Sequence, residues 1–213
     1  MNPQTQPHSG VLVAFATMAT LPHKLGGRPL NQRSHRQQRI GIGEVAASAQ
    51  PLLLRTLLGS CVSVCLRDPV LGIGGMNHIL VPGKDSQGGL ESRCGVQAME
   101  LLINALMKLG ADRRRMVAKA FGGGNVLPGF QTPTVGEQNS RFVREFLNTE
   151  KIPLIAERMG GSKAVLVNFH THSGKVSIHT VDGSRLPKIV RDETDYLRTP
   201  LADRFNVDEP TIF

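Results

Sequence analysis

Cys61 is the residue of this sequence best suited to do chemistry, because it follows a turn-forming Gly59-Ser60 pair between two apolar segments. Gly59 and Ser60 allow a sharp turn that would lift the Cys61 sulfur out of a sheet and aim backbone N–H groups at an oxyanion. A cysteine nucleophile also needs a nearby base, because the thiolate attacks and the unperturbed thiol pKa lies above neutral. The pattern therefore predicts a cysteine nucleophile with its oxyanion donors in the same turn.

His78 is the predicted base for Cys61. The segments 62–66 and 73–81 are apolar, and the Asp68-Pro69 pair between them favours a turn. Two antiparallel strands joined there would bring His78 back beside Cys61. A neutral imidazole accepts the thiol proton, and the imidazolium returns a proton to the leaving group.

Other cysteine and histidine residues leave different functions open. A buried cysteine often acts only as a small apolar side chain, and Cys65 is expected in the core. A zinc or redox site built from Cys61, Cys65 and His78 is a second class of function, although this spacing lacks a second ligand pair. His170 and His172 share one face of a predicted strand, but they precede a turn and are expected there as solvated side chains.

Composition limits the class of protein. The chain has 213 residues, enough for one domain with a real core, and a formal net charge of +8. Much of the excess charge lies before residue 40, and the chain has no Trp and one Tyr, so a nucleic-acid partner is not expected. Three cysteines at irregular spacing indicate a reducing compartment, the cytoplasm. The apolar stretch 11–21 is too short to span a bilayer, so no membrane insertion is expected.

The glycine run 122–124 is interpreted as a tight turn bordering the site. It lacks both the spacing of a dinucleotide-binding loop and a following Lys-Ser/Thr pair. No cofactor is therefore expected from this motif.

Hydrophobic periodicity predicts a mixed α/β domain with the element order β-β-β-α-β-α-β-β-β. A helix is expected over 96–109 with Gly110 as its C-cap, and a second helix beginning at Asn139 or Ser140. We expect a disordered basic arm over residues 1–38, a folded domain over 39–190 and a C-terminal tail over 191–213, with a loop at 84–91. The predicted strands are residues 40–45, one apolar region of 52–58 and 62–66 interrupted at 59–61, and residues 73–81, 117–121, 152–157, 164–169 and 175–179.

Ordered sequence blocks spread over roughly residues 40 to 180 resemble the CheD family. A shared cysteine and histidine alone would be weak evidence, whereas several blocks in the same order are specific. The blocks are residues 57–69, 72–82, 98–104, 119–124, 135–139 and 160–161.

CheD proteins are chemoreceptor glutamine deamidases of bacterial chemotaxis, so the resemblance implies hydrolysis of glutamine side chains in the cytoplasmic helices of methyl-accepting chemotaxis receptors. It implies Cys61 and His78 as the catalytic pair, a thioester intermediate, release of ammonia, and a possible activity on glutamate methyl esters. It also implies a single layered α/β sandwich with a mixed sheet, similar to the catalytic domains of deamidating toxins, with no metal and no cofactor. A CheC-type phosphatase is an implied partner, and a non-catalytic adaptor that binds receptors or this phosphatase is the alternative function.

The sequence departs from the family pattern at the residue that would orient the histidine. The family has a threonine six residues before the cysteine, and Arg55 stands there in this chain. Thr56 is adjacent, but strand alternation points Arg55 and Thr56 to opposite faces. The orienting residue is therefore left unassigned between Thr56 and other residues.

Overall fold

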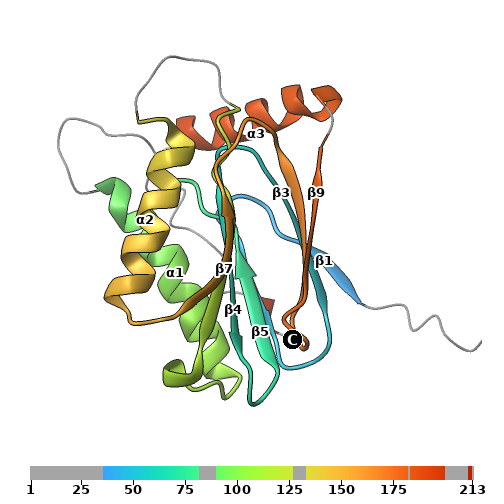
Figure 1. Cartoon of the computed structure of the whole chain (residues 1–213), viewed down its shortest axis with the longest axis vertical. Coiled ribbons are helices and arrows are strands. Elements are labelled where there is room, and N and C mark those ends of the chain that lie inside the picture. The colour runs from blue at the N-terminus through green and yellow to red at the C-terminus, as the bar shows by residue number, and fades with distance from the viewer. Residues whose placement is uncertain (1–35, 82–89, 127–132, 182, 200–210, 213) are drawn as a thin grey trace, which may run out of the picture. The chain divides into compact units, whose positions relative to one another are not determined.

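The computed structural model describes residues 36–81, 90–126, 133–181, 183–199 and 211–212. These residues form two mixed β-sheets and three α-helices arranged in layers (Figure 1). The predicted α/β sandwich with mixed sheets is therefore confirmed. Most of the predicted basic arm and of the loop at 84–91 lies outside the described residues.

The larger sheet has six strands in the order β10-β2-β5-β4-β6-β7. The β10–β2 and β6–β7 pairs are parallel, and the other pairs are antiparallel. The β4–β5 hairpin is the one that the sequence predicts. The strands are β2 (Val45–Ser48), β4 (Val62–Asp68), β5 (Ile73–Asn77), β6 (Val117–Gly122), β7 (Leu154–Met159) and β10 (Thr211–Ile212).

The smaller sheet has four strands in the order β1-β3-β8-β9, with a parallel β1–β3 pair and antiparallel partners elsewhere. Strand β3 alternates between half-buried and buried side chains, so Leu54, Thr56 and Leu58 point inward. The strands are β1 (Gln37–Arg39), β3 (Leu53–Leu58), β8 (Val165–His170) and β9 (Val176–Thr180).

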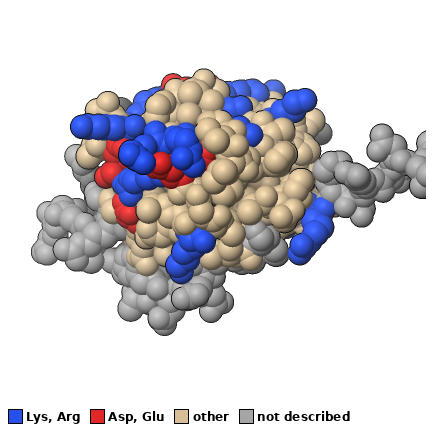
Figure 2. All heavy atoms as spheres, turned by 90° about the horizontal axis from the view of Figure 1, so that it is seen from below, with Lys and Arg blue, Asp and Glu red and all other residues tan. Residues whose placement is uncertain are grey.

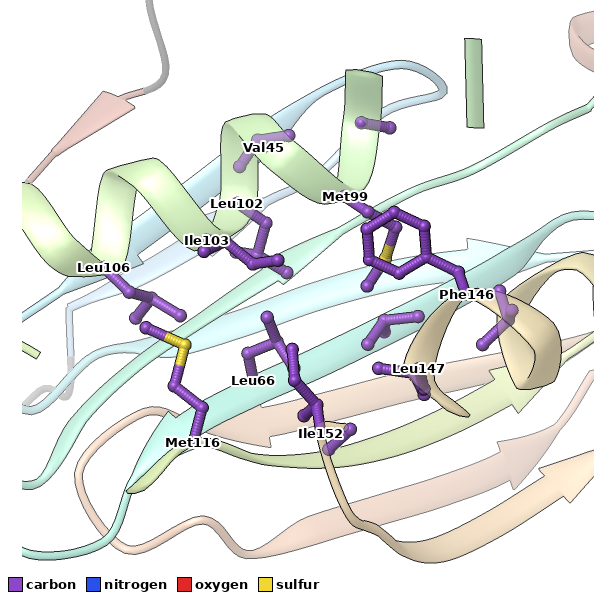
Figure 3. Packing of buried hydrophobic residues seen from close by; sticks show 14 of the residues in the cluster. Val45, Leu66, Met99, Leu102, Ile103, Leu106, Met116, Phe146, Leu147 and Ile152 are labelled. Atoms are coloured by element: carbon purple, nitrogen blue, oxygen red, sulfur yellow. The ribbon is translucent and has the colours of Figure 1, made fainter. Parts of the chain in front are cut away.

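Helices α1 (Leu90–Lys108) and α2 (Val135–Thr149) contact the outer face of the six-stranded sheet. Figure 3 shows the core between them: Leu102, Ile103 and Leu106 of α1 lie over Leu66 of β4. Each such fully buried side chain contributes roughly 1.5–3 kcal/mol. No helix of the described residues is both long enough and apolar enough to cross a membrane.

A second core lies on the other side of the six-stranded sheet. It combines inward residues of β3 and β8 with residues of β4 and β5, so the two sheets pack against each other. Cys61, Cys65 and Met76 belong to this second core, which places the predicted nucleophile between the sheets.

Helix α2 begins earlier than predicted. Its N-cap is Thr134, which forms a capping box with Glu137. Asn139 and Ser140, the predicted caps, are buried inside the helix and make other bonds, so that prediction was wrong. In the sequence, a buried Asn or Ser that bonds to another element cannot be told from one that caps a helix, because the residue type is the same.

Helix α3 (Leu186–Arg198) runs across residue 190, where the sequence predicted the start of a tail. Only Ile189 and Glu193 are buried in this helix. Tyr196 and Leu197 also pack, half-buried, against the second core, but the charged residues around them are typical of a solvated tail, which is why the helix was not predicted.

Basic and acidic side chains are interspersed on the face of the molecule shown in Figure 2. Part of this charge is paired in the structure, so the net positive charge does not translate into an unbroken basic surface there. The ion pairs of the short 3-10 helix η1 (Arg113–Arg115) join Arg113 to Glu150, Arg114 to Asp112 and Arg115 to Asp68.

Candidate active site

Cys61 lies at the end of the connection between the two sheets. Strand β3 ends at Leu58 and β4 begins at Val62, so residues 59–61 carry the chain from one sheet to the other. A short crossover between packed sheets holds Cys61 in their shared interior, where it is fully buried.

The backbone carbonyl groups of all three crossover residues accept hydrogen bonds from neighbouring segments. Gly124 N–H donates to the Gly59 carbonyl at 2.8 Å, Gly123 N–H to the Cys61 carbonyl at 2.7 Å, and Asn139 Nδ2 to the Ser60 carbonyl at 2.8 Å. Three fixed carbonyls hold the backbone in one orientation, which leaves the Ser60 and Cys61 N–H groups available to a different partner.

The glycine run 122–124 is the turn that the sequence predicted beside the site. Gly122 and Gly123 have φ of 107° and 65°, a region that other residues rarely adopt. A Cβ at Gly122 would lie 2.3 Å from the Cys61 carbonyl oxygen, and one at Gly123 would lie 2.2 Å from Ser140 Oγ. Glycine is therefore required here to brace the crossover.

His78 lies on the same face of the six-stranded sheet as Cys61. Val62 and Ile79 exchange two backbone hydrogen bonds of 2.9 and 2.7 Å, which makes His78 a diagonal neighbour of Cys61 across the strand pair. The register thus places the two predicted residues on one face of the sheet and on neighbouring strands.

Thr56 holds the imidazole from the opposite sheet. Its Oγ1 lies 2.8 Å from His78 Nδ1 and donates to the Ile40 carbonyl at 2.8 Å. Because the hydroxyl proton is used toward Ile40, Oγ1 accepts from Nδ1–H, and Nε2 is left as the acceptor nitrogen. Arg55 points to the other face and bonds Asn168 and Gln37, so Thr56 is the residue that contacts His78.

His78 is neutral near pH 7 in this structure. Burial lowers the pKa of His78 to about 4, although the Ile40 carbonyl acts in the opposite direction and the charge of Arg39 adds to the lowering. Nε2 is buried and has no hydrogen-bond partner among the residues that the structure describes. A buried neutral imidazole with a free acceptor nitrogen is suited to take a proton.

The thiol of Cys61 is also neutral in this structure. Burial raises the pKa of Cys61 well above its usual value, and the charge of Glu193 and a hydrogen bond with its carboxylate raise it further. Burial likewise raises the pKa of Cys65, which packs in the second core as the sequence predicted. Within the described part of the chain, no group of three or more His, Cys, Asp or Glu side chains is placed to hold a metal ion.

Glu193 of α3 is the site residue that the sequence did not reveal. Its Oε1 accepts from the Ser60 N–H at 2.9 Å and from the Cys61 N–H at 3.4 Å, and its Oε2 accepts from Ser60 Oγ at 2.6 Å. The turn predicted to supply oxyanion donors, Gly59 and Ser60, thus directs the Ser60 amide, together with that of Cys61, at one carboxylate oxygen. Gly59 permits this approach, since a Cβ there would lie 2.7 Å from Glu193 Oε1.

The fold and the site define an α/β sandwich with a cysteine, histidine and threonine cluster at the crossover between its sheets. The family described as CheD chemotactic sensory transduction matches residues 81–180. A probable chemoreceptor glutamine deamidase CheD of Thiobacillus denitrificans is 46% identical over 158 residues, which cover 72% of this chain and 78% of the relative. The protein of the same name from Agrobacterium fabrum is 44% identical over 160 residues, covering 74% and 87%. The chain belongs to the CheD family.

A solved structure, the hypothetical protein YfiH of Bacillus licheniformis, is also similar. It has a TM-score of 0.36 at 16% identity, covering 56% of this chain and 50% of that one. A likeness at this level carries no conclusion about function.

Proposed function

We propose that this chain hydrolyses glutamine side chains of chemoreceptors to glutamate and releases ammonia. The observation that carries the proposal is the Thr56-held His78, a residue that lies on the same sheet face as Cys61 and whose Nε2 has no partner among the described residues. The names of the relatives supply the substrate, a chemoreceptor glutamine. The family match begins after His78, so the roles of Cys61 and His78 rest on the geometry of the site.

The proposed reaction is acyl transfer through Cys61. His78 Nε2 takes the thiol proton as Sγ attacks the glutamine carboxamide carbon, and the Ser60 and Cys61 N–H groups hold the oxyanion. His78 then protonates the departing ammonia, and a water deprotonated by His78 cleaves the thioester. Removal of one oxyanion donor in such a site typically costs about 3–4 kcal/mol of transition-state stabilisation.

A glutamate methyl ester would enter the same reaction. Only the leaving group changes, from ammonia to methanol, and the thioester that follows is identical. Methylesterase activity on receptors is therefore a proposed second activity of the same site.

A basic groove next to the site suits an acidic receptor helix. Arg39, Arg55, Arg185 and Lys188 line a cavity of about 570 Å³ that reaches Thr56. Cationic walls attract acidic partners and increase their rate of encounter. We propose that the cytoplasmic receptor helix lies along the Arg39 and Arg55 wall of this groove, which belongs to the four-stranded sheet and not to α3, with its glutamine directed toward Cys61.

The test is incubation of the purified chain with receptor fragments, followed by mass spectrometry of the receptor peptides. Conversion of selected glutamines to glutamates is expected with the wild type and with Cys94→Ala, a cysteine outside the site. No conversion is expected with Cys61→Ala. Identical receptor spectra for wild type and Cys61→Ala would overturn the proposed deamidase activity. They would favour a non-catalytic adaptor that binds receptors or a CheC-type phosphatase.

A further inference from the structure

Glu193 is a buried carboxylate held by the catalytic turn. It is 2% exposed, and none of the ion pairs found among the described residues includes it. A buried carboxylate is costly unless charge-assisted hydrogen bonds replace its hydration. Ser60 provides two of these bonds and Cys61 a longer third one, so the turn is a built anion site.

The group in this anion site is the chemical product of the proposed reaction. Hydrolysis of a glutamine side chain yields a glutamate side chain, whose carboxylate must leave from beside the Cys61 sulfur and the Ser60 and Cys61 amides. Glu193 is itself a glutamate side chain, and its carboxylate accepts hydrogen bonds from the Ser60 and Cys61 amides, where the carboxylate of the product would lie. Burial raises the pKa of the Cys61 thiol, and the charge of Glu193 raises it further.

Helix α3 contacts the turn at residues 59–61 through two side chains on one face of the helix. Ile189 and Glu193 lie one helical turn apart and point inward together. Gly59 provides the space for both, because a Cβ there would lie 2.6 Å from Ile189 Cγ2 and 2.7 Å from Glu193 Oε1. A glutamine-bearing helix with an apolar residue one turn earlier would fit the same surface.

The space around this contact is only partly filled. A cavity of about 400 Å³ has His78, Ile40 and Leu57 on one side and residues of α3, including Glu193 and Tyr196, on the other. Helix α3 buries only two side chains, and its N-cap residue Arg185 makes no side-chain capping bond. Tyr196 and Leu197 of the helix also pack, half-buried, against the second core. A helix with two buried residues is held less firmly than α2 with its six, so a competing helix can replace it.

We propose that the Glu193 carboxylate occupies the subsite for the substrate glutamine side chain, and that α3 covers the docking surface of the receptor helix as an internal product mimic. The inference rests on the proposed function. The receptor helix must then displace α3 before its glutamine reaches Cys61.

The decisive experiment uses Glu193→Gln in the full chain. The substitution places a carboxamide in the subsite, so Cys61 Sγ should bond to its carbon as the carbon–nitrogen bond breaks and ammonia leaves. Water then cleaves the thioester, and glutamine plus water becomes glutamate plus ammonia. Peptide mass spectrometry should find glutamate at position 193 in the purified variant.

Two matched variants define the controls for self-conversion. Glu193→Gln combined with Cys61→Ala should keep its glutamine. Asp192→Gln, an exposed neighbour on the same helix, should also keep its glutamine. Glutamine persisting in Glu193→Gln, in a preparation whose wild type converts receptors, would overturn the subsite assignment and leave the proposed function standing. Self-conversion without any receptor conversion would support the subsite and overturn the receptor as substrate.

A second variant tests the covering helix itself. Glu193→Ala should convert receptor peptides several-fold faster than the wild type, mainly through a lower KM, while Glu145→Ala, the same substitution at an exposed position of α2 outside both cavities, should match the wild type. Circular dichroism and thermal unfolding check that Glu193→Ala is folded. A folded Glu193→Ala that converts receptors more slowly than the wild type would mean that Glu193 assists the reaction, and would overturn the product-mimic role.

Discussion

The Thr56 hydroxyl oxygen lies 2.8 Å from Nδ1 of His78, and this contact joins a residue of the four-stranded sheet to one beside the six-stranded sheet. The same hydroxyl donates to the Ile40 carbonyl, which fixes the direction of the hydrogen bond to His78. The tautomer of His78 therefore depends on the packing of the two sheets as well as on local sequence.

Thr56→Val should weaken catalysis by removing this hydrogen bond while keeping the shape of the side chain. A lost buried hydrogen bond costs about 1–3 kcal/mol, which corresponds to a fall in kcat of roughly 5- to 150-fold. Receptor deamidation rates over a range of pH would measure it. Thr56→Ser restores the hydroxyl and should recover most of the rate, whereas equal losses in both variants would point to packing instead of orientation.

His78 should make the folded state sensitive to mild acid. Its pKa is about 4 in the folded chain against 6.5 ordinarily, so the unfolded chain binds a proton that the folded chain does not. The contribution is complete above pH 6.5 and is lost progressively as the pH falls toward 4, by about 3 kcal/mol in total. Urea unfolding at pH 7 and pH 5 should show a smaller decrease for His78→Asn than for the wild type. Equal decreases in the two proteins would refute the burial of a neutral His78.

Much of the fold and the placement of Cys61 and His78 on one sheet face could be predicted, because they depend on local signals. The turn at Gly59 and Ser60 and the β4–β5 hairpin are encoded by neighbouring residues, and they alone place Cys61 near His78. The role of Thr56 could not be read from sequence, because it depends on which face of β3 meets the other sheet. That choice is made by packing between segments far apart in the chain.

Glu193 was missed for a related reason. Its burial depends on α3 docking against a turn more than a hundred residues earlier, and the sequence around it is polar. An acidic residue in a polar segment is normally solvated, so its type does not indicate burial. The sequence signal for the inward face of this helix is the apolar spacing around it: Ile189 four residues earlier is buried, and Tyr196 and Leu197 three and four residues later pack against the second core.

Gly123→Ala should damage the site more than a comparable glycine substitution elsewhere. Gly123 and Gly160 both have positive φ, of 65° and 94°, so alanine at either position costs roughly 1–2 kcal/mol in backbone strain. A Cβ at Gly123 would also meet Ser140 Oγ at 2.2 Å, whereas nothing lies within 4 Å at Gly160. Thermal unfolding should show the larger loss for Gly123→Ala, together with lost deamidation. Similar losses for the two variants would show that the turn tolerates the added methyl group.

Reversal of charge in the basic groove should weaken receptor binding without slowing the chemical step. Arg55→Glu is expected to raise the KM for receptor fragments about two- to fivefold, on the scale of about 0.5–1 kcal/mol for a solvated charge contact. The effect should shrink at high salt. Arg141→Glu, an exposed position on α2, makes the same charge change outside the groove and should leave KM unchanged. An equal rise in KM for Arg141→Glu would assign the effect to net charge.

The reactivity of the Cys61 thiol should report whether α3 is in place. In the structure Cys61 is fully buried, and burial with the Glu193 carboxylate raises its pKa, so labelling of the wild type near neutral pH should be slow. Glu193→Ala removes both the negative charge and the hydrogen bond, and the thiol should react at least several-fold faster, while Asp192→Ala should label at the wild-type rate. Adding His78→Ala to Glu193→Ala should lower the rate again, because the base is gone. If Glu193→Ala leaves the labelling rate of Cys61 unchanged, α3 does not shield the nucleophile, and its Glu193 contact has no part in holding the thiol neutral.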